Sequence, residues 1–288
     1  MSEPTSDAWT SGDGRVAVVT GANQGLGLAV VAALRRRLGP DAAVYLTGRD
    51  RARVQAAAAR LRAEGLAVVP ELLDVRADAD VERFAALLRD RHGGVDIVVS
   101  NAAARITPDA TMAEQVRAFV DTNNRGTTRL LRALLPLLRP RGRYLVVASS
   151  FGTLRELDPS LHARFGTPGL TLDDLDATMD AYAAAVEAGR DGDEGWPAWI
   201  NVPSKVGQVA AARIAARTVC ADGPPGAFVA AACPGLVDTD ASRPWFTDMT
   251  EAQRPEEAAA HLVRLMLDPV GDDLAGELVQ FGRVLPWR

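Results

Sequence analysis

The sequence predicts one doubly wound α/β domain with a parallel sheet of about seven strands. Three observations lead to this fold class: a buried strand that runs into a glycine-rich turn and a helix, an alternation of apolar strands with amphipathic helices, and the lack of a Pro-, Ser- or Gly-rich linker. With 288 residues and 48% hydrophobic content, the chain can bury one large core. We expect one domain over residues 15–288, after a loose tail over residues 1–14.

The first element is the apolar run Val16–Val19, which suits a parallel strand covered on both faces. Helix formers continue over Ala29–Leu38, and three glycines lie between the two. Gly21 permits a sharp turn, Gly25 lets a diphosphate approach the backbone, and Gly27 lets the helix pack closely on the strand. The helix N-terminus then presents free N–H groups to an anion. The stretch predicts a Rossmann-like dinucleotide site; the alternative is a tight connection without a ligand.

The following elements keep the alternation. Asp50 N-caps a helix, Asp78 begins the next, and Thr111 opens a capping box before a helical stretch to Leu138. The other predicted helices cover residues 172–188, 202–221 and 255–267. The other predicted strands cover residues 43–47, 66–73, 95–100, 143–148, 227–232 and 277–281. Because a helix connects each strand to the next through a right-handed crossover, the strands are expected to lie parallel. Residues 151–200 interrupt this regularity, and we interpret them as an insertion that forms a lid.

The composition excludes several classes of function. A net charge of -5 and scattered arginines give no basic surface, so nucleic acid is not an expected partner. Cys220 and Cys233 lack a CxxC or Cys/His spacing, which predicts reduced thiols and no metal site. No apolar run approaches the length of a membrane span, and the N-terminal residues lack the pattern of a signal peptide. We therefore expect a cytoplasmic protein without membrane contact.

Arg49 ends the second predicted strand, where the adenosine ribose of a dinucleotide should lie. A carboxylate at this place would bind both ribose hydroxyls, whereas a guanidinium pairs with a 2′-phosphate. The residue favours NADP(H) over NAD(H). The alternative is a solvated arginine beside the helix cap Asp50.

The segment Thr20–Gly27 reads Thr-Gly-x-x-x-Gly-x-Gly and resembles the short-chain dehydrogenase/reductase family. The resemblance implies an NADP(H) site that includes, besides the three glycines and Arg49, further residues of this turn and of later strand ends. These are Asn23, Gln24, Leu26, Asp74, Val75, Asn101, Lys205, Pro234, Gly235, Val237 and Thr239. Ala103 departs from the glycine that the family carries after its Asn-Asn-Ala motif.

The resemblance also implies roles at the reacting end of the cofactor. Asn123 would hold a water in a proton relay, Ser150 would hydrogen-bond the substrate carbonyl, and Lys205 would hold the nicotinamide ribose. For Asn123 the alternative is a side chain that bonds a nearby carbonyl. Glu194-Gly-Trp-Pro, at the end of the insertion, is similar to the monomeric carbonyl reductase branch, which implies a monomer.

The family's Tyr-x-x-x-Lys pair reads Asn201-Val-Pro-Ser-Lys205 in this sequence. An amide can donate a hydrogen bond to a carbonyl, but it does not titrate near neutral pH. Three explanations remain: another proton source or an iminium substrate, a cofactor-binding protein without redox turnover, or an engineered asparagine that traps a complex. Asn201 could instead simply N-cap the helix. Of the tyrosines, Tyr182 in the insertion could reach the pocket, although packing is the favoured interpretation.

We expect an NADPH-dependent oxidoreductase that reduces a carbonyl or imine at an atypical site formed by Asn123, Ser150, Asn201 and Lys205. The alternative is a cyclase, an isomerase or a silent binding protein of the same fold. Aromatic and apolar residues are expected to line the substrate pocket and to favour a bulky apolar or aromatic small molecule. They are Phe151, Trp199, Trp245, Phe246 and Met249.

Overall fold

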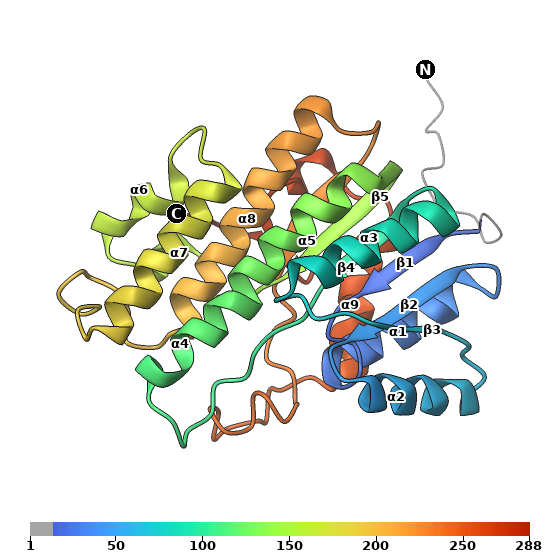
Figure 1. Cartoon of the computed structure of the whole chain (residues 1–288), viewed down its shortest axis with the longest axis horizontal. Coiled ribbons are helices and arrows are strands. Elements are labelled where there is room, and N and C mark those ends of the chain that lie inside the picture. Colours follow the sequence, from blue (N-terminus) through green and yellow to red (C-terminus); the bar gives the residue numbers. More distant parts are fainter. Residues whose placement is uncertain (1–13) are drawn as a thin grey trace.

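The computed structural model describes residues 14–288, in which eight strands form one continuous sheet (Figure 1). The order is β3-β2-β1-β4-β5-β6-β7-β8, and every neighbouring pair is parallel except the antiparallel pair β7 and β8. The strands are β1 Val16–Val19, β2 Ala43–Gly48, β3 Val69–Leu72, β4 Val95–Ser100, β5 Leu138–Val147, β6 Phe228–Ala232, β7 Leu278–Gln280 and β8 Arg283–Leu285. The doubly wound fold class is confirmed. The predicted tail lies outside the described residues apart from Gly14.

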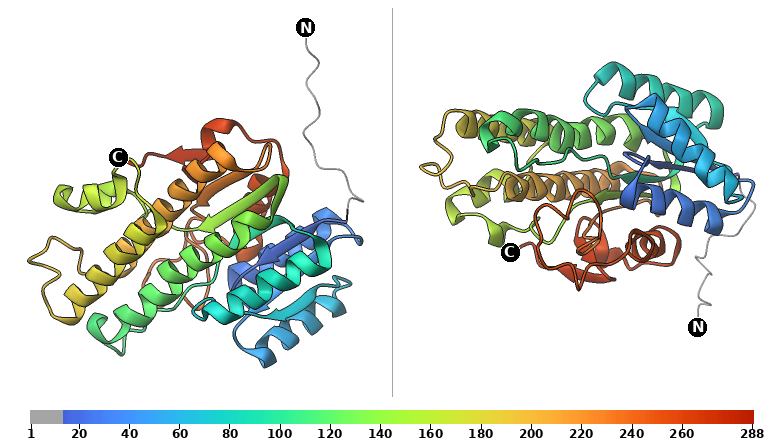
Figure 2. Two further views of the ribbon diagram at one scale, coloured as in Figure 1. Left: turned by 45° about the horizontal axis from the view of Figure 1, so that its top comes forward. Right: turned by 90° about the horizontal axis from the view of Figure 1, so that it is seen from below.

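Helices cover both faces of the sheet, and Figure 2 shows the resulting layers. One face carries α1 Gly25–Leu38, α2 Arg51–Ala63 and α9 Pro255–Leu267. The other carries α3 Asp78–His92, α4 Met112–Val120, α5 Gly126–Leu134 and α8 Asn201–Asp222. Because both faces are covered, the inner strands β1 and β4 are buried along their whole length, as their apolar runs require.

Several boundaries differ from the prediction. The sheet gains β8, which returns beside β7 after a turn at Phe281 and Gly282. β3 begins at Val69 rather than at residue 66, and β5 begins at Leu138 and pairs with β4 through a register shift between Val95 and Ile97. A helix to residue 138 was therefore wrong.

The predicted helix from Thr111 is also interrupted. Its capping box is confirmed, but a π-helical turn over Asp121–Arg125 separates α4 from α5, and α5 ends at Leu134 before a short 3-10 turn. Turns of this kind, with an i→i+5 bond, are frequent at functional sites.

The insertion contains the predicted helix as α7 Leu172–Glu187, preceded by a short helix α6 His162–Gly166 that the sequence did not indicate. Trp196 is 4% exposed and packs between Phe165 and Tyr182, at ring-centroid distances of 6.1 and 4.7 Å. These aromatic contacts fix the returning chain to α6 and α7.

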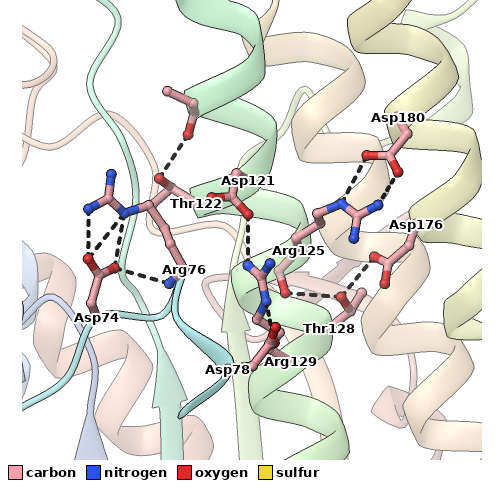
Figure 3. A network of polar contacts seen from close by, with 11 residues as sticks. Asp74, Arg76, Asp78, Asp121, Thr122, Arg125, Thr128, Arg129, Asp176 and Asp180 are labelled. Atoms are coloured by element: carbon pink, nitrogen blue, oxygen red, sulfur yellow. Dashed lines mark hydrogen bonds and ion pairs between the residues drawn. The ribbon is translucent and has the colours of Figure 1, made fainter. Parts of the chain in front are cut away.

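Helix α7 lies against α4 and the π-helical turn, and a seam of arginines and acids joins it to the π-helical turn and to α5 (Figure 3). Arg125 forms a two-pronged ion pair with Asp180, and the Thr128 hydroxyl donates to Asp176 at 2.8 Å. Arg117 pairs with Glu187 in the same way toward the other end of α7. The seam therefore joins the insertion to the helices that carry the π-helical turn.

No helix within residues 14–288 combines the length and hydropathy needed to cross a membrane.

Candidate active site

The glycine-rich turn after β1 has no room for a side chain at Gly21 or at Gly27. Gly21 adopts φ 62°, and a Cβ there would lie 2.7 Å from the Cα of Ala102. A Cβ on Gly27 would lie 2.6 Å from Nδ2 of Asn101 and 2.7 Å from the Gly21 carbonyl oxygen. Asn101 in turn donates from Nδ2 to the Thr20 carbonyl at 2.9 Å. Backbone contacts between the ends of β1 and β4 therefore shape this turn, and they need glycine.

The N-terminus of α1 opens onto this turn. Gln24 is extended and exposed, and its side chain does not cap the helix. The first-turn N–H groups are thus available to an anion, and Gly25 at φ 54° carries no side chain that would block one. A Cβ on Gly25 would lie 3.5 Å from the methyl group of Thr239, in the loop after β6. This arrangement fits a dinucleotide diphosphate.

The strand ends beyond the turn carry the residues assigned to the adenosine half. Arg49 is exposed after β2 and makes no hydrogen bond or ion pair with another residue of the described chain. Asp74 follows β3 and forms a two-pronged pair with Arg76, with Nη2–Oδ2 2.7 Å, and this hydrogen bond holds the pKa of Asp74 below its usual value. Val75 is 4% exposed and packs against Gly126, and Asn23 lies beside Gly48.

A cavity of about 360 Å³ opens at the carboxyl ends of β4, β5 and β6. Its lining brings together all four predicted catalytic residues and part of the predicted cofactor site. These residues are Leu26, Asn123, Ser150, Asn201, Lys205, Pro234, Gly235, Val237 and Thr239. The remaining predicted cofactor residues lie outside this cavity, at the ends of β1 to β4 described above.

Aromatic side chains form one wall of the cavity. Phe151 and Trp199, at the two ends of the insertion, meet edge to face with ring centroids 5.2 Å apart. Trp245, in the loop after β6, lies 6.2 Å from Trp199 and donates its indole N–H to the Ile106 carbonyl at 3.3 Å. Phe246 also lines the cavity, whereas Met249 does not, so its assignment was wrong.

Asn123 lies in the π-helical turn and is 1% exposed. Its Oδ1 accepts from the Ala104 N–H at 2.8 Å, and its backbone carbonyl accepts from the Thr127 hydroxyl at 2.6 Å. The side chain therefore fixes the loop after β4 by accepting from an N–H, and the alternative of a bond to a nearby carbonyl was wrong.

Asn201 is the first residue of α8, and the cap position falls on Ile200. The Asn201 side chain makes no hydrogen bond within the described part of the chain, so the interpretation as an N-cap was wrong. One turn further, Lys205 donates from Nζ to Oε1 of Gln208 at 2.7 Å. Burial lowers the pKa of Lys205 to about 8.

The two serines after β5 differ in their contacts. Both Ser149 and Ser150 line the cavity, and the Ser149 hydroxyl also accepts from the Phe151 N–H at 3.4 Å. Tyr182 is fully buried against Trp196 and does not reach the cavity, so the packing interpretation is confirmed.

Sequence reasoning missed the polar residues that contact the predicted ones. Gln208 accepts a hydrogen bond from Lys205 and donates one to Thr127. Thr127 donates in turn to the backbone carbonyl of Asn123. Arg76 donates to the carboxylate of Asp74. One signal for Gln208 was available: it is the only side chain with a polar group in the run Val206–Ala212 of α8.

Comparisons with known proteins identify the family of this chain. The family model described as short chain dehydrogenase matches residues 15–158. Carbonyl reductase (NADPH) 1 of Bos taurus is 34% identical over 278 residues, which cover 94% of this chain and 98% of the relative. The chain belongs to the short-chain dehydrogenase family.

Two solved structures share this fold across nearly the whole chain. Salutaridine reductase from Papaver somniferum has a TM-score of 0.79 at 24% identity and covers 92% of this chain and 99% of its own.

The second solved structure is an NADPH-bound carbonyl reductase from chicken fatty liver. It has a TM-score of 0.69 at 21% identity and covers 95% of this chain and 98% of its own. The short-chain dehydrogenase family model ends at residue 158, before α8 begins, so its match does not include Lys205.

Proposed function

We propose that this protein is an NADPH-dependent reductase that acts on a carbonyl or imine of a bulky, apolar or aromatic small molecule. The observation that carries the proposal is the convergence of Ser150, Asn201 and Lys205 on one cavity beside the glycine turn. The carboxyl ends of parallel strands, where these residues lie, are where doubly wound folds bind their ligands.

NADP(H) fits the residues at the nucleotide end. Gly21, Gly25 and Gly27 leave the backbone open to the diphosphate, and the uncapped N-terminus of α1 stabilises its charge. We assign Arg49 to the 2′-phosphate because its guanidinium is exposed and unpaired within residues 14–288. When bound, the cofactor supplies a hydride. The two relatives whose names include NADPH support NADP(H) as the cofactor.

The substrate class follows from the wall of the cavity. Phe151, Trp199 and Trp245 offer flat apolar faces, and no Asp or Glu is among the cavity-lining residues of the described chain. Such a pocket holds ring systems by contact area and gives a cationic substrate no counter-charge. Ser150 and Asn201 each carry a hydrogen-bond donor for the carbonyl oxygen.

We infer that Asn201 occupies the position at which the family carries its catalytic tyrosine, since it lies four residues before Lys205 on the same helical face. This makes the site atypical. An amide orients and polarises a carbonyl, but it does not supply a proton near neutral pH.

The test is NADPH oxidation followed by absorbance, with a panel of aromatic ketones, polycyclic ketones, cyclic imines and short polar aldehydes. We expect turnover with the ring compounds. Preference for the short aldehydes would refute the substrate class. NADPH binding without oxidation of any compound would instead favour the non-redox alternative.

We also propose a monomer. Helix α7 packs against α4 and is joined by ion pairs to α4, the π-helical turn and α5, so the part of these helices that it covers is not free for a second copy; Figure 3 shows the pair that involves the π-helical turn. Light scattering after size exclusion measures the mass; a dimer that survives dilution would contradict the proposal.

A further inference from the structure

Gln208 is a polar residue in an apolar part of α8. It is 1% exposed, and its neighbours Val206, Val209 and Ala210 belong to the buried core. Burying a primary amide costs free energy unless its donors and acceptor are paired. Both ends of this amide are paired, and one partner is the ammonium of Lys205.

The contacts extend from Lys205 to the π-helical turn. Gln208 Oε1 accepts from Lys205 Nζ at 2.7 Å, and Gln208 Nε2 donates to the Thr127 hydroxyl at 3.4 Å. The Thr127 hydroxyl donates to the Asn123 carbonyl at 2.6 Å. Because the last acceptor is a backbone atom, the chain of bonds fixes the orientation of the Gln208 amide, and the amide holds the ammonium of a residue that lines the cavity.

Lys205 is the only lysine among the 32 Lys and Arg residues of the sequence. Arginine stays protonated at any physiological pH, whereas the pKa of a lysine responds strongly to burial. Cationic groups that serve only in ion pairs are arginines throughout this chain. The single lysine lines the cavity, so a cation that can lose its proton is present at the site.

The groups around the ammonium are neutral. Cys233 faces it after β6, and burial raises the pKa of that thiol. Ser150 after β5, Asn123 in the π-helical turn and Asn201 on α8 carry no charge, and Arg105 is the other charged residue of the cavity lining in the described chain. With no carboxylate nearby to hold the proton, burial brings the pKa of Lys205 to about 8, which suits an acid at neutral pH.

Asn201 leaves room for such a role. It lies one turn before Lys205 on the same face of α8, lines the same cavity and makes no hydrogen bond with the described residues. Its side chain is much shorter than a tyrosine, so it leaves space for a carbonyl closer to α8. An ammonium has three donors, and Gln208 takes one of them. One remains for the nicotinamide ribose and one for the substrate.

We propose that Lys205, held by Gln208, donates the proton to the substrate's carbonyl oxygen, in place of the tyrosine that the family uses. The inference rests on the proposed reductase function. As hydride reaches the carbonyl carbon, the C=O π pair moves to oxygen and takes a proton from Nζ. The products are the alcohol, the oxidised cofactor and a neutral amine, which is protonated again from solvent through the cavity. Lys205 is then a catalytic residue, and Gln208 is a positioning residue.

The single lysine makes the protonation state directly measurable. Protein labelled with ¹³C and ¹⁵N only in lysine gives one side-chain NMR signal, and its pH titration in the cofactor-free protein reports Lys205 alone. We expect a midpoint well below that of a solvated lysine. Gln208→Glu places a carboxylate at the ammonium and should raise the midpoint by about one pH unit or more. Gln208→Met removes the acceptor at similar length and should lower it.

The rate measurement uses the same variants. Relative to the wild type, the pH at which kcat falls on the alkaline side should rise in Gln208→Glu and drop in Gln208→Met. Both shifts should follow the NMR midpoint. Gln55→Glu, an exposed position on α2, makes the same charge change away from the cavity and should move neither. Thermal melts identify a variant that fails to fold, and the remaining variant still decides the direction.

Lys205→Arg separates proton donation from cofactor holding. The guanidinium keeps the positive charge and donors but does not release a proton near neutral pH. NADPH affinity should fall little, and kcat should fall by about 10²–10⁴-fold. An alkaline limb that stays fixed while the NMR midpoint moves, or full turnover by Lys205→Arg, would overturn the acid role. If no carbonyl is reduced by the wild type at any pH, the reductase function itself fails, and the acid role with it.

Discussion

The two ends of the cofactor cleft are built in different ways. At the nucleotide end, backbone atoms of the β1 turn, α1 and the end of β4 lie so close that Gly21 and Gly27 have no space for a methyl group. At the catalytic end, side chains from α8, the π-helical turn and two loops meet around an open cavity, and Asn201 bonds none of the described residues. We therefore expect a side chain added at these two glycines to disturb the fold, and a substitution of a side chain that faces the cavity mainly to alter the chemistry. The departures from the family pattern are therefore expected where side chains face open space.

The largest expected effect is at the catalytic end. Asn201→Tyr places a phenol on the face of α8 that carries Lys205, and ketone reduction should rise by about tenfold or more, within the range of a general acid. Rates with the best ketone of the panel measure it. Asn201→Phe adds the same ring without the hydroxyl and should give no gain.

A flat ketone rate together with lost native activity in both variants would mean that the reaction uses the space beside Asn201. Thermal unfolding should change little in either case, because Asn201 does not cap α8.

Gly27→Ala tests the nucleotide end. The methyl group meets the Gly21 carbonyl and the Asn101 side chain, so α1 must shift, at a cost of about 1–3 kcal/mol in the free energy of unfolding. NADPH affinity should fall as well. Chemical denaturation and cofactor titration measure both. Gly192→Ala, where the methyl group meets open space, is the control; equal effects at the two positions would remove the contrast between the ends.

Arg49→Asp should shift preference from NADPH toward NADH by about tenfold or more, since it exchanges one charge-assisted pair for repulsion of the 2′-phosphate. Titration of wild type and variant with both cofactors gives the ratio of dissociation constants. Arg53→Asp changes the same charge on the exposed start of α2 and serves as the control. An unchanged ratio for Arg49→Asp would identify Arg49 as a solvated residue.

The smallest effect is expected at the seam outside both ends. Asp180→Asn removes one partner of Arg125 at a partly exposed site, and the free energy of unfolding should fall by less than about 1 kcal/mol. Melts at low and high salt should show the loss only at low salt. A loss of several kcal/mol would mean that the insertion, rather than the sheet, limits stability.

The same contrast explains what the sequence could predict. Turn glycines, apolar runs and the Thr111 capping box are local, so β1, α1 and α4 were predictable from short segments. β8 was not predictable, because a strand of three residues carries no periodicity. Its turn also places the non-glycine residue Phe281 at φ 50°, before Gly282. The break between α4 and α5 depends on tertiary contacts: Asn123 reaches Ala104, and Arg125 reaches α7.

In the candidate site, too, some features were predictable from the sequence and others depend on tertiary contacts. The resemblance to the short-chain dehydrogenase/reductase family predicted that Ser150, Asn201 and Lys205 lie at one site, and the structure places all three in the lining of one cavity. The bonds of Gln208 and Arg76 were not predictable, since each depends on how a neighbouring side chain is oriented in the folded protein. The roles of these residues remain predictions.

The single lysine has a consequence for durability. Aldehydes condense with unprotonated primary amines to form imines, and a protein that handles carbonyl compounds meets such electrophiles continuously. In this sequence the other cationic side chains are arginines, which remain protonated. The only side-chain amine is that of Lys205, which lines the cavity. Imine adducts on lysine are thereby restricted to Lys205. Under the proposed function, substrate and cofactor in the cavity would shield its amine from other aldehydes.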